Sequence, residues 1–100
     1  MKKTKDKFFS QDDLSEQVKQ WQKAGNKIVF TNGCFDILHL GHIDYLEQAR
    51  SKGDRLIIGL NTDSSVKKIK GEHRPINNEM ARARMLCALE FVDGVTFFTE

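Results

Sequence analysis

The stretch TNGCFDILHLGH, residues 31–42, gathers several residue types that can do chemistry. It holds two histidines, His39 and His42, with Gly41 between them, and Asn32-Gly33 lies just upstream. Imidazoles can donate hydrogen bonds to anions, carry protons or bind metals, and glycine lets a ligand approach the backbone closely. Three interpretations therefore compete: a hairpin turn, a metal site, or a binding site for phosphates.

The first two interpretations explain only part of this stretch. Asn32-Gly33 is a common hairpin signal, but a hairpin needs an alternating strand after the turn, and the residues that follow have the pattern of a helix. A zinc site would use Cys34, His39 and His42, since both residue types bind zinc. A structural zinc site needs four protein ligands and no second close pair exists, which leaves a three-ligand catalytic site as a minority alternative.

The phosphate interpretation accounts for more of the residues. Gly41 and His42 lie where the next helix should begin, and a helix N-terminus offers unpaired N–H groups and a partial positive charge. Gly41 would let a phosphate reach the backbone, and Gly33 would let a ligand lie over the end of the preceding strand. His39 and His42 would then donate to the same anion. The common GxGxxG and GxxxxGK[ST] nucleotide motifs are both absent.

A basic cluster in VKKIKGEHRP, residues 66–75, supports an anionic ligand. Lys67 and Lys68 could equally form a solvated helix face. Lys70 and Arg74 flank a glycine loop and could close over a crevice. Their charges would neutralise the phosphates of a nucleoside triphosphate, which carries about four negative charges.

The elements that would position these residues alternate between helix and strand. The pattern predicts a helix from Ser10 to Gly25, a strand over residues 27–31, a helix over 42–53, a strand over 55–60, a short helix opened by residues 61–63, a loop over 70–78, a helix over 79–91 and a strand over 95–98. The residues expected to face the core from the helices are Leu14, Val18, Trp21, Ile43, Leu46, Ala49, Val66, Ile69, Met80, Ala83, Cys87 and Phe91. This alternation predicts an α/β fold with a parallel sheet and helices on its faces.

The parallel sheet gives the site its expected location. Ligands of such sheets bind at the carboxyl ends of the strands. The stretch 31–42 follows the first strand at that end, and Asn61 to Asp63 follow the second strand. Two polar loops are therefore expected to converge on one crevice.

Composition limits the class of protein. The 100 residues suit a single domain, and 39% hydrophobic with 30% charged residues indicates a globular chain. The net charge of +2 does not by itself indicate nucleic acid, and no aromatic residue lies between Asn61 and Met80 to stack on bases. Residues 1–9 are expected to form a flexible basic tail. Two cysteines without a pairing pattern, no membrane span and no signal peptide indicate a cytoplasmic protein.

These segments resemble a known family. GCFDILHLGH resembles the HxGH signature of the nucleotidyltransferase superfamily. The segments VFTNGCFDILHLGHIDYLEQA, GLNTDSSVKKIKGEHRPIN and RARMLCALEFVDGV resemble the adenylyltransferase domain of ADP-heptose synthases. The related glycerol-3-phosphate cytidylyltransferases share the FDxLHxGH core. The resemblance runs from about residue 10 to the end, and the motifs are specific when taken together.

The resemblance implies a Rossmann-like sheet and a reaction. AMP would pass from ATP to a sugar 1-phosphate resembling heptose 1-phosphate, with release of pyrophosphate, as in the biosynthesis of ADP-heptose for the lipopolysaccharide core. Mg²⁺ would accompany the nucleotide without dedicated protein ligands, and relatives are often dimers, so a homodimer is expected. Two alternatives stay open: a catalytically incomplete nucleotide-binding module, and a cytidylyltransferase that uses CTP and a polyol phosphate.

The resemblance also implies roles for single residues. His39 and His42 would bind the triphosphate and stabilise the transition state, and Lys70 would contact phosphate as a third catalytic residue. The expected nucleotide-binding residues are Thr31, Asn32, Gly33, Cys34, Phe35, Gly41 and Arg74. Asp36 would order the loop, Asp63 would lie near the acceptor, and Arg82 matches an arginine near the active site of the family. The alternative for Arg82 is an exposed helix arginine.

One departure from the family concerns its second nucleotide motif, which lies near the C-terminus of relatives. No such motif follows here, and the predicted elements end with the third strand of a sheet that normally has about five. We therefore expect residues 1–100 to form one nucleotidyltransferase-like domain, truncated after its third strand, from which the C-terminal half of the family domain is absent.

Overall fold

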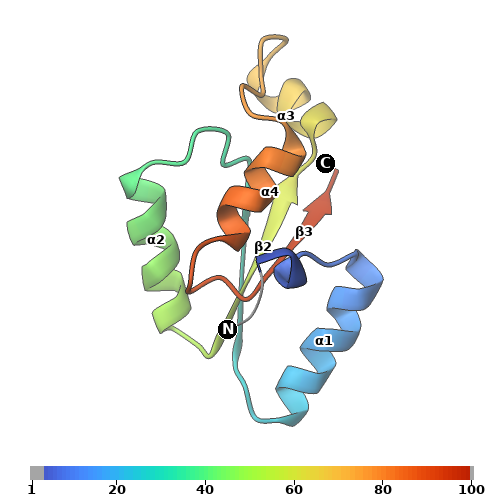
Figure 1. Cartoon of the computed structure of the whole chain (residues 1–100), viewed down its shortest axis with the longest axis vertical. Coiled ribbons are helices and arrows are strands. Elements are labelled where there is room, and N and C mark those ends of the chain that lie inside the picture. Colours follow the sequence, from blue (N-terminus) through green and yellow to red (C-terminus); the bar gives the residue numbers. More distant parts are fainter. Residues whose placement is uncertain (1–3, 100) are drawn as a thin grey trace.

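The computed structural model describes residues 4–99 and confirms the alternation of helices and strands (Figure 1). The elements are the 3-10 helix η1 (Thr4–Lys7), α1 (Gln11–Lys23), β1 (Ile28–Gly33), α2 (Leu40–Ser51), β2 (Arg55–Asn61), α3 (Asp63–Lys70), α4 (Glu79–Cys87) and β3 (Gly94–Phe98). Strand β1 runs two residues further than predicted, to Gly33, and helix α4 ends four residues earlier than predicted, at Cys87.

The three strands form one open parallel sheet in the order β1-β2-β3. Ile28 pairs with Arg55 in the first ladder, and Ile57 pairs with Gly94 in the second. Asn32-Gly33 lies inside β1 and is not a hairpin turn, because the next strand runs parallel to β1. The carboxyl ends of β1 and β2 therefore lie side by side, as the site prediction required.

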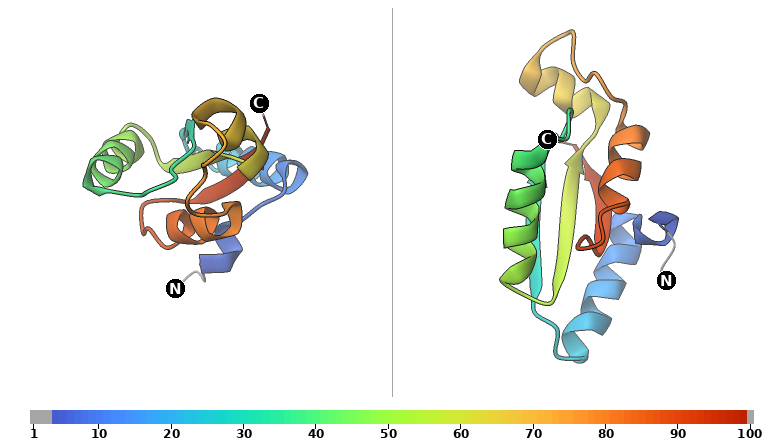
Figure 2. Two further views of the ribbon diagram at one scale, coloured as in Figure 1. Left: turned by 90° about the horizontal axis from the view of Figure 1, so that it is seen from above. Right: turned by 60° about the vertical axis from the view of Figure 1, so that its left-hand side comes forward.

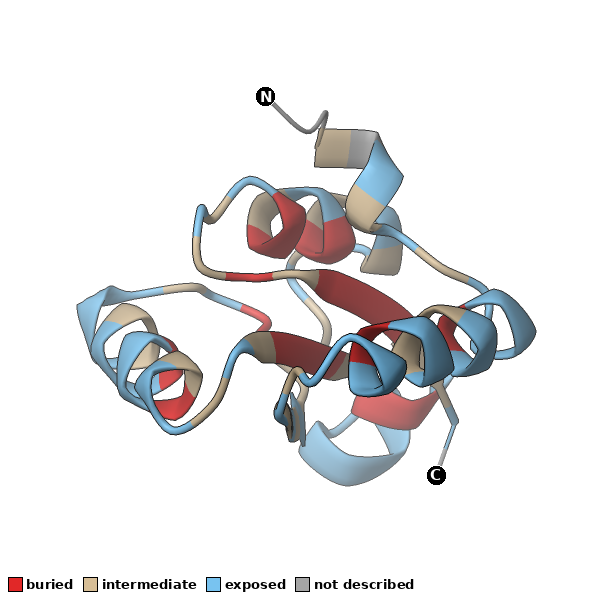
Figure 3. Cartoon of the chain, turned by 90° about the horizontal axis from the view of Figure 1, so that it is seen from below, coloured by how far each residue is buried: buried red, intermediate tan, exposed pale blue. Residues whose placement is uncertain are grey.

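Helices cover both faces of the sheet, so the predicted α/β class is confirmed (Figure 2). On one face Leu56, Ile58 and Leu60 of β2 pack in a cluster with residues of α2 and α4. On the other face Ile57 packs with Leu14 and Trp21 of α1. Seen from below, most residues of β2 and β3 are buried and the outer faces of the helices are exposed (Figure 3), whereas β1 at the edge of the sheet holds no buried residue. None of the helices among residues 4–99 is long and apolar enough to cross a membrane.

The N-terminal segment differs from the expected tail in its described part. Residues 4–7 form η1, Phe8 makes a parallel bridge to Val95, and the Phe9 backbone N–H donates to the Val95 carbonyl at 2.9 Å. The Phe9 ring packs against Trp21, with 6.5 Å between ring centroids. The expectation of a flexible tail is therefore wrong for residues 4–9, because two apolar rings and a backbone hydrogen bond hold them beside β3. Residues 1–3 lie outside the described range.

Two residues expected in the core are exposed. Ile69 is 49% exposed because α3 lies beyond the carboxyl ends of the strands and not flat on the sheet (Figure 1). Met80 is 62% exposed because α4 turns Arg82, Ala83 and Leu86 inward instead. The predictions of Ala83 and Cys87 as inward residues of this helix are confirmed. However, the hydrophobic pattern placed Met80 on the buried face and did not include Arg82, whose side chain has no exposed surface.

Candidate functional site

The turn after β1 is built around a strained residue, Phe35. Its φ angle of 45° lies in the left-handed region, which a bulky L-residue adopts only at a cost of roughly 1–3 kcal/mol. Its ring is buried and packs edge-on against His42, with 5.3 Å between centroids. A β-carbon at Gly33 would come within 3.0 Å of the same ring. Gly33 is therefore required here to make room for Phe35.

The two histidines cap helix α2. His39 is the N-cap residue, and its Nδ1 accepts a hydrogen bond from the Gly41 backbone N–H at 3.1 Å. In return, the His39 backbone N–H donates to Nδ1 of His42 at 3.3 Å. The rings stack with centroids 4.0 Å apart. This is a capping box in which imidazoles take the places of the usual Ser or Thr and Glu.

The caps determine which protons the imidazoles carry. Since each Nδ1 accepts from a backbone N–H, the neutral ring must carry its proton on Nε2. Burial, followed by the charge of neighbouring His39, lowers the pKa of His42 and favours its neutral form. Each ring then has an Nε2–H donor left for a ligand. These are the groups that a phosphate oxygen requires.

The structure explains the glycine at position 41 differently from the predicted phosphate contact. A β-carbon at this position would lie 2.9 Å from Cε1 of His39, so a larger residue would displace the capping ring. The Gly41 N–H is already bonded to His39, and Gly41 does not line the cleft described next. Its prediction as a direct phosphate contact is therefore not supported by its position.

A cleft of about 650 Å³ opens at the carboxyl end of β1, beside the start of α2. Its size lies within the usual range for small-molecule sites. The residues that line it are Asn32, Gly33, Cys34, Phe35, Asp36, Ile37, His39, His42, Tyr45, Ile69, Lys70 and Arg74. Nine of the thirteen residues predicted for the site are in this set.

Asp36, which was predicted to order the loop, is bonded to the segment that follows α3. It is 4% exposed, and its carboxylate accepts hydrogen bonds from the Ile76 and Asn77 backbone N–H groups, both at 2.9 Å. Arg74 adds an ion pair through Nε. Although burial raises the pKa of this carboxyl, the hydrogen bonds from Asn77, Ile76 and Arg74 outweigh it and lower the pKa. A charged Asp36 therefore ties the loop after α3 to the turn after β1.

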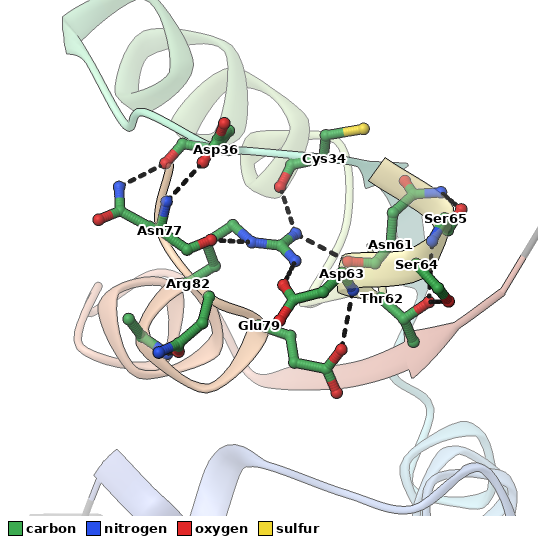
Figure 4. A network of polar contacts seen from close by, with 12 residues as sticks. Cys34, Asp36, Asn61, Thr62, Asp63, Ser64, Ser65, Asn77, Glu79 and Arg82 are labelled. Atoms are coloured by element: carbon green, nitrogen blue, oxygen red, sulfur yellow. Dashed lines mark hydrogen bonds and ion pairs between the residues drawn. The ribbon is translucent and has the colours of Figure 1, made fainter. Parts of the chain in front are cut away.

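Arg82 connects the turn after β1, the end of β2 and the loop before α4 (Figure 4). Its Nη1 donates to the carbonyls of Cys34 and Asn61, at 2.8 and 2.7 Å. Its Nε donates to the Asn77 carbonyl at 3.0 Å, and Nη2 pairs with Asp63 at 2.7 Å. The alternative of an exposed helix arginine is therefore wrong. With all three of its guanidinium nitrogens bonded to the protein, Arg82 positions the loops that follow β1 and β2.

Four predicted residues lie outside the cleft lining. Arg82 and Asp63 are bonded to each other, Gly41 is bonded to His39, and the Thr31 hydroxyl lies 3.1 Å from the Tyr45 hydroxyl. Three lining residues were not predicted as site residues: Ile37, Tyr45 and Ile69. The spacing could have indicated Tyr45, since it follows His42 by three residues on one helix face. No signal in the sequence indicated Ile37.

The positive charges that line the cleft come from the end of α3 and the loop that follows it. Lys70 ends α3 and is exposed, whereas the Arg74 guanidinium is partly engaged by Asp36. Asp36 is the acidic residue of the lining, and its oxygens are already bonded. No group of three or more His, Cys, Asp or Glu side chains among residues 4–99 could hold a metal ion. The described residues therefore do not fit a metal centre made of protein ligands.

The two cysteines lie in different surroundings. Both are free, and Cys87 is buried in the core cluster. Burial raises the pKa of the Cys87 thiol to about 11, outweighing the opposing charges of Lys7 and Arg84. Cys34 contributes its carbonyl oxygen to the bond with Arg82. The metal interpretation that joined Cys34 to the two histidines is not supported, because both imidazoles use Nδ1 to cap α2.

Comparisons with known proteins agree with this geometry. Residues 30–100 match the family model described as cytidylyltransferase-like. The chain is 56% identical over 95 residues to the bifunctional protein HldE of Methylobacillus flagellatus, which covers 95% of this chain and 20% of that protein. It is 62% identical over 87 residues to HldE of Hyphomonas neptunium, covering 87% and 18% respectively. The chain thus spans about a fifth of the length of these curated relatives.

A solved structure shares the fold. The lipopolysaccharide core biosynthesis protein of Thermoplasma volcanium superposes with a TM-score of 0.68 and is 35% identical in sequence. The match covers 74% of this chain and 59% of that one. The parallel sheet with flanking helices is therefore a shared architecture, and the cleft lies at the sheet edge where such folds bind ligands.

Proposed function

Since this chain belongs to the cytidylyltransferase-like family, we propose that it carries a nucleotidyltransferase site in the cleft beside His39 and His42. The single observation that carries the proposal is the pair of stacked imidazoles whose Nδ1 atoms cap α2 and whose Nε2–H groups remain to bind phosphate. A nucleoside triphosphate would place its phosphates at these donors, with Lys70 adding positive charge.

The reaction needs alignment and charge stabilisation more than acid–base chemistry. A phosphate oxygen of the acceptor is already anionic near neutral pH, so it can attack the α-phosphorus without a general base. The new bond joins the acceptor phosphate to the nucleoside monophosphate, and the bond to the β-phosphate breaks with release of pyrophosphate. His39 and His42 would donate to the oxygens on which charge grows, and Arg82 would hold the surrounding loops in position.

The substrates follow from the relatives and stay proposals for this chain. We propose ATP as the nucleotide and a sugar 1-phosphate resembling heptose 1-phosphate as the acceptor, because the matched relatives are HldE proteins and a lipopolysaccharide core biosynthesis protein. CTP with a polyol phosphate is the second candidate, favoured by the cytidylyltransferase-like family match. A homodimer located in the cytoplasm completes the proposal.

A divalent ion such as Mg²⁺ would belong to the nucleotide. Asp36, the acidic residue of the cleft lining, is bonded by Ile76, Asn77 and Arg74, so the described residues provide no carboxylate to hold the ion. Its ligands would be phosphate oxygens and water. No catalytic step of this chain is assigned to it.

The test separates the donor role of His39 from its capping role. Asparagine is a good N-cap residue but cannot place an Nε2–H donor in the cleft, whereas alanine does neither. We expect His39→Asn and His39→Ala both to lower the rate of pyrophosphate release from ATP and acceptor by about 10²–10³. Only His39→Ala should also lose roughly 1 kcal/mol of unfolding free energy in urea titration.

The matched control is His73→Asn, because His73 is exposed and lies outside the cleft lining. It should keep the parental rate. A parental rate in His39→Asn would refute the donor role. Calorimetric binding of ATP or CTP without any pyrophosphate release by the parent chain would instead support the nucleotide-binding module and refute transferase activity.

A further inference from the structure

We infer that Tyr45 forms the wall of the cleft that packs against the nucleoside half of the bound nucleotide. The inference rests on the proposed function and adds to it a residue that selects nucleoside from bare polyphosphate. The observations that carry it are the position of Tyr45 on α2, its hydrogen bond to Thr31, its exposure, and the distribution of charge along the cleft.

Tyr45 lies on the same face of α2 as His42, which precedes it by three residues. Both side chains line the cleft. The Tyr45 ring is therefore one helical turn from the phosphate-binding donors. A nucleotide that placed its phosphates at His42 would extend its sugar and base over a distance of this order.

The ring of Tyr45 is exposed yet held in place. It is 55% exposed, whereas the Phe35 ring of the same cleft is 8% exposed and packs in the core. Its hydroxyl lies 3.1 Å from the Thr31 hydroxyl at the end of β1, which restricts the direction of the ring. An aromatic ring with a free face and a fixed direction is suited to stacking on a planar ligand.

The charge distribution places the nucleoside at this end of the cleft. Lys70 and Arg74, the cationic side chains of the lining, come from α3 and the loop that follows it. The end of β1 contributes the uncharged residues Asn32 and Gly33, and Thr31 directs Tyr45 to the same end. Phosphates of the nucleotide and of the acceptor are anionic, so they are drawn to the cations. The uncharged nucleoside then fits the end with Tyr45.

The experiment compares two ligands that share phosphates and differ in the nucleoside. ATP and inorganic tripolyphosphate are titrated by calorimetry into the full chain and into Tyr45→Ala, Tyr45→Leu and Tyr45→Phe. The contribution of one aromatic–base stack predicts that Tyr45→Ala and Tyr45→Leu bind ATP about tenfold more weakly. Tripolyphosphate should bind all variants within twofold of the parent, and Tyr45→Phe should keep ATP binding within about threefold.

A control variant on the same helix tests for a general effect of substitutions in α2. Gln48→Ala lies three residues further along the same helix, on an exposed position outside the cleft lining, and should bind both ligands as the parent does. Equal weakening of ATP and tripolyphosphate in Tyr45→Ala would overturn the inference, since Tyr45 would then act through the phosphate site. Unchanged ATP binding in that variant would overturn it as well.

The failure of the proposed function would look different. If the parent chain bound neither ATP nor tripolyphosphate, the phosphate site itself would be refuted, and the role of Tyr45 with it. If the parent bound tripolyphosphate and ATP with equal affinity and Tyr45→Ala changed neither, only the nucleoside contact would be lost. The two ligands therefore distinguish the two proposals in one set of titrations.

Discussion

Among single residues, Arg82 has the greatest influence on the site. Its guanidinium donates to carbonyls in the turn after β1, at the end of β2 and in the loop before α4, and it pairs with Asp63. Buried arginines are tolerated when their donors are satisfied, because guanidinium has a fixed fork of N–H groups. Here three loops that are distant in the sequence meet at one side chain.

Replacing Arg82 with methionine should destabilise the fold. Methionine fills similar space but leaves the Cys34, Asn61 and Asn77 carbonyls and the Asp63 carboxylate without their donor. We expect a loss of roughly 3–5 kcal/mol in the free energy of unfolding, measured by urea titration with circular dichroism. Arg82→Lys should lose less, since an ammonium still supplies donors at one of these positions.

The matched control is Arg84→Met, two residues along α4 at an exposed position. Its free energy of unfolding should stay within about 0.5 kcal/mol of the parent. A loss in Arg82→Met no larger than that of Arg84→Met would show that the four hydrogen bonds do not hold the loops together.

Among the elements, α2 uses the same two histidines for the stability of its N-terminus and for the proposed phosphate site. Its N-terminus is capped by the same two imidazoles that face the cleft. The Nδ1 atoms hold the helix and the Nε2–H groups are left for a ligand. The capping use needs neutral rings, because a protonated imidazole has no acceptor nitrogen, whereas the Nε2–H donor is present in either form.

The pH dependence of stability follows from His42. Burial, and then the charge of His39, lowers its pKa below the ordinary value of 6.5, so the unfolded chain binds more protons than the folded chain just below pH 6.5. The free energy of unfolding should therefore contain the full contribution of neutral His42 above about pH 6.5. It should decrease as the pH falls from there toward the pKa of His42 in the folded chain. Urea titrations at pH 7.5 and 5.5 measure the difference.

The variant that isolates this titration is His42→Gln. Glutamine is a usual partner at the third helical position of a capping box, so the helix start should survive without a titrating group. Its loss of stability between pH 7.5 and 5.5 should be smaller than that of the parent, whereas His73→Gln, on an exposed loop residue, should retain the parental loss. An equal loss in His42→Gln and the parent would show that other groups cause the pH dependence.

At the scale of the whole molecule, the segment before α1 completes the packing of the sheet. The partly buried Phe9 packs beside Trp21 against the second core cluster, and its backbone N–H donates to the Val95 carbonyl. Phe8 lies against Phe97 at 5.0 Å between centroids. Residues near the N-terminus thereby contact β3 at the other end of the chain. A small sheet gains buried apolar surface in this way, which matters because short chains bury less of their surface.

Truncating Phe9 should therefore destabilise the whole chain. We expect Phe9→Ala to lose roughly 2–4 kcal/mol of unfolding free energy, since a packed aromatic ring is removed from the core cluster. Phe30→Ala is the matched control because the Phe30 ring is 62% exposed on β1, and its effect should stay within about 0.5 kcal/mol. Thermal and urea unfolding of both variants measure this. A Phe9→Ala protein as stable as Phe30→Ala would restore the original expectation of a flexible tail.

Local sequence patterns were sufficient to predict α1 to α4 and β1 to β3 in their order, but not η1. Ser10 caps α1 through a bond from the Asp13 N–H, and Thr62 caps α3, as their residue types indicated. Alternating helices and strands implied a parallel sheet, and the sheet implied where its loops converge. These features depend on residues close together in the chain, so a single sequence contains the information needed to predict them.

Tertiary structure alone decided how single side chains are used. The inward turn of Arg82, the exposure of Met80 and the meeting of Tyr45 with Thr31 depend on contacts between residues 14 to 48 positions apart. The capping of α2 by its own histidines also escaped the sequence, because imidazoles rarely take that role. Composition and spacing predicted that an anion site follows β1, whereas only the tertiary structure shows that three loops meet at one guanidinium.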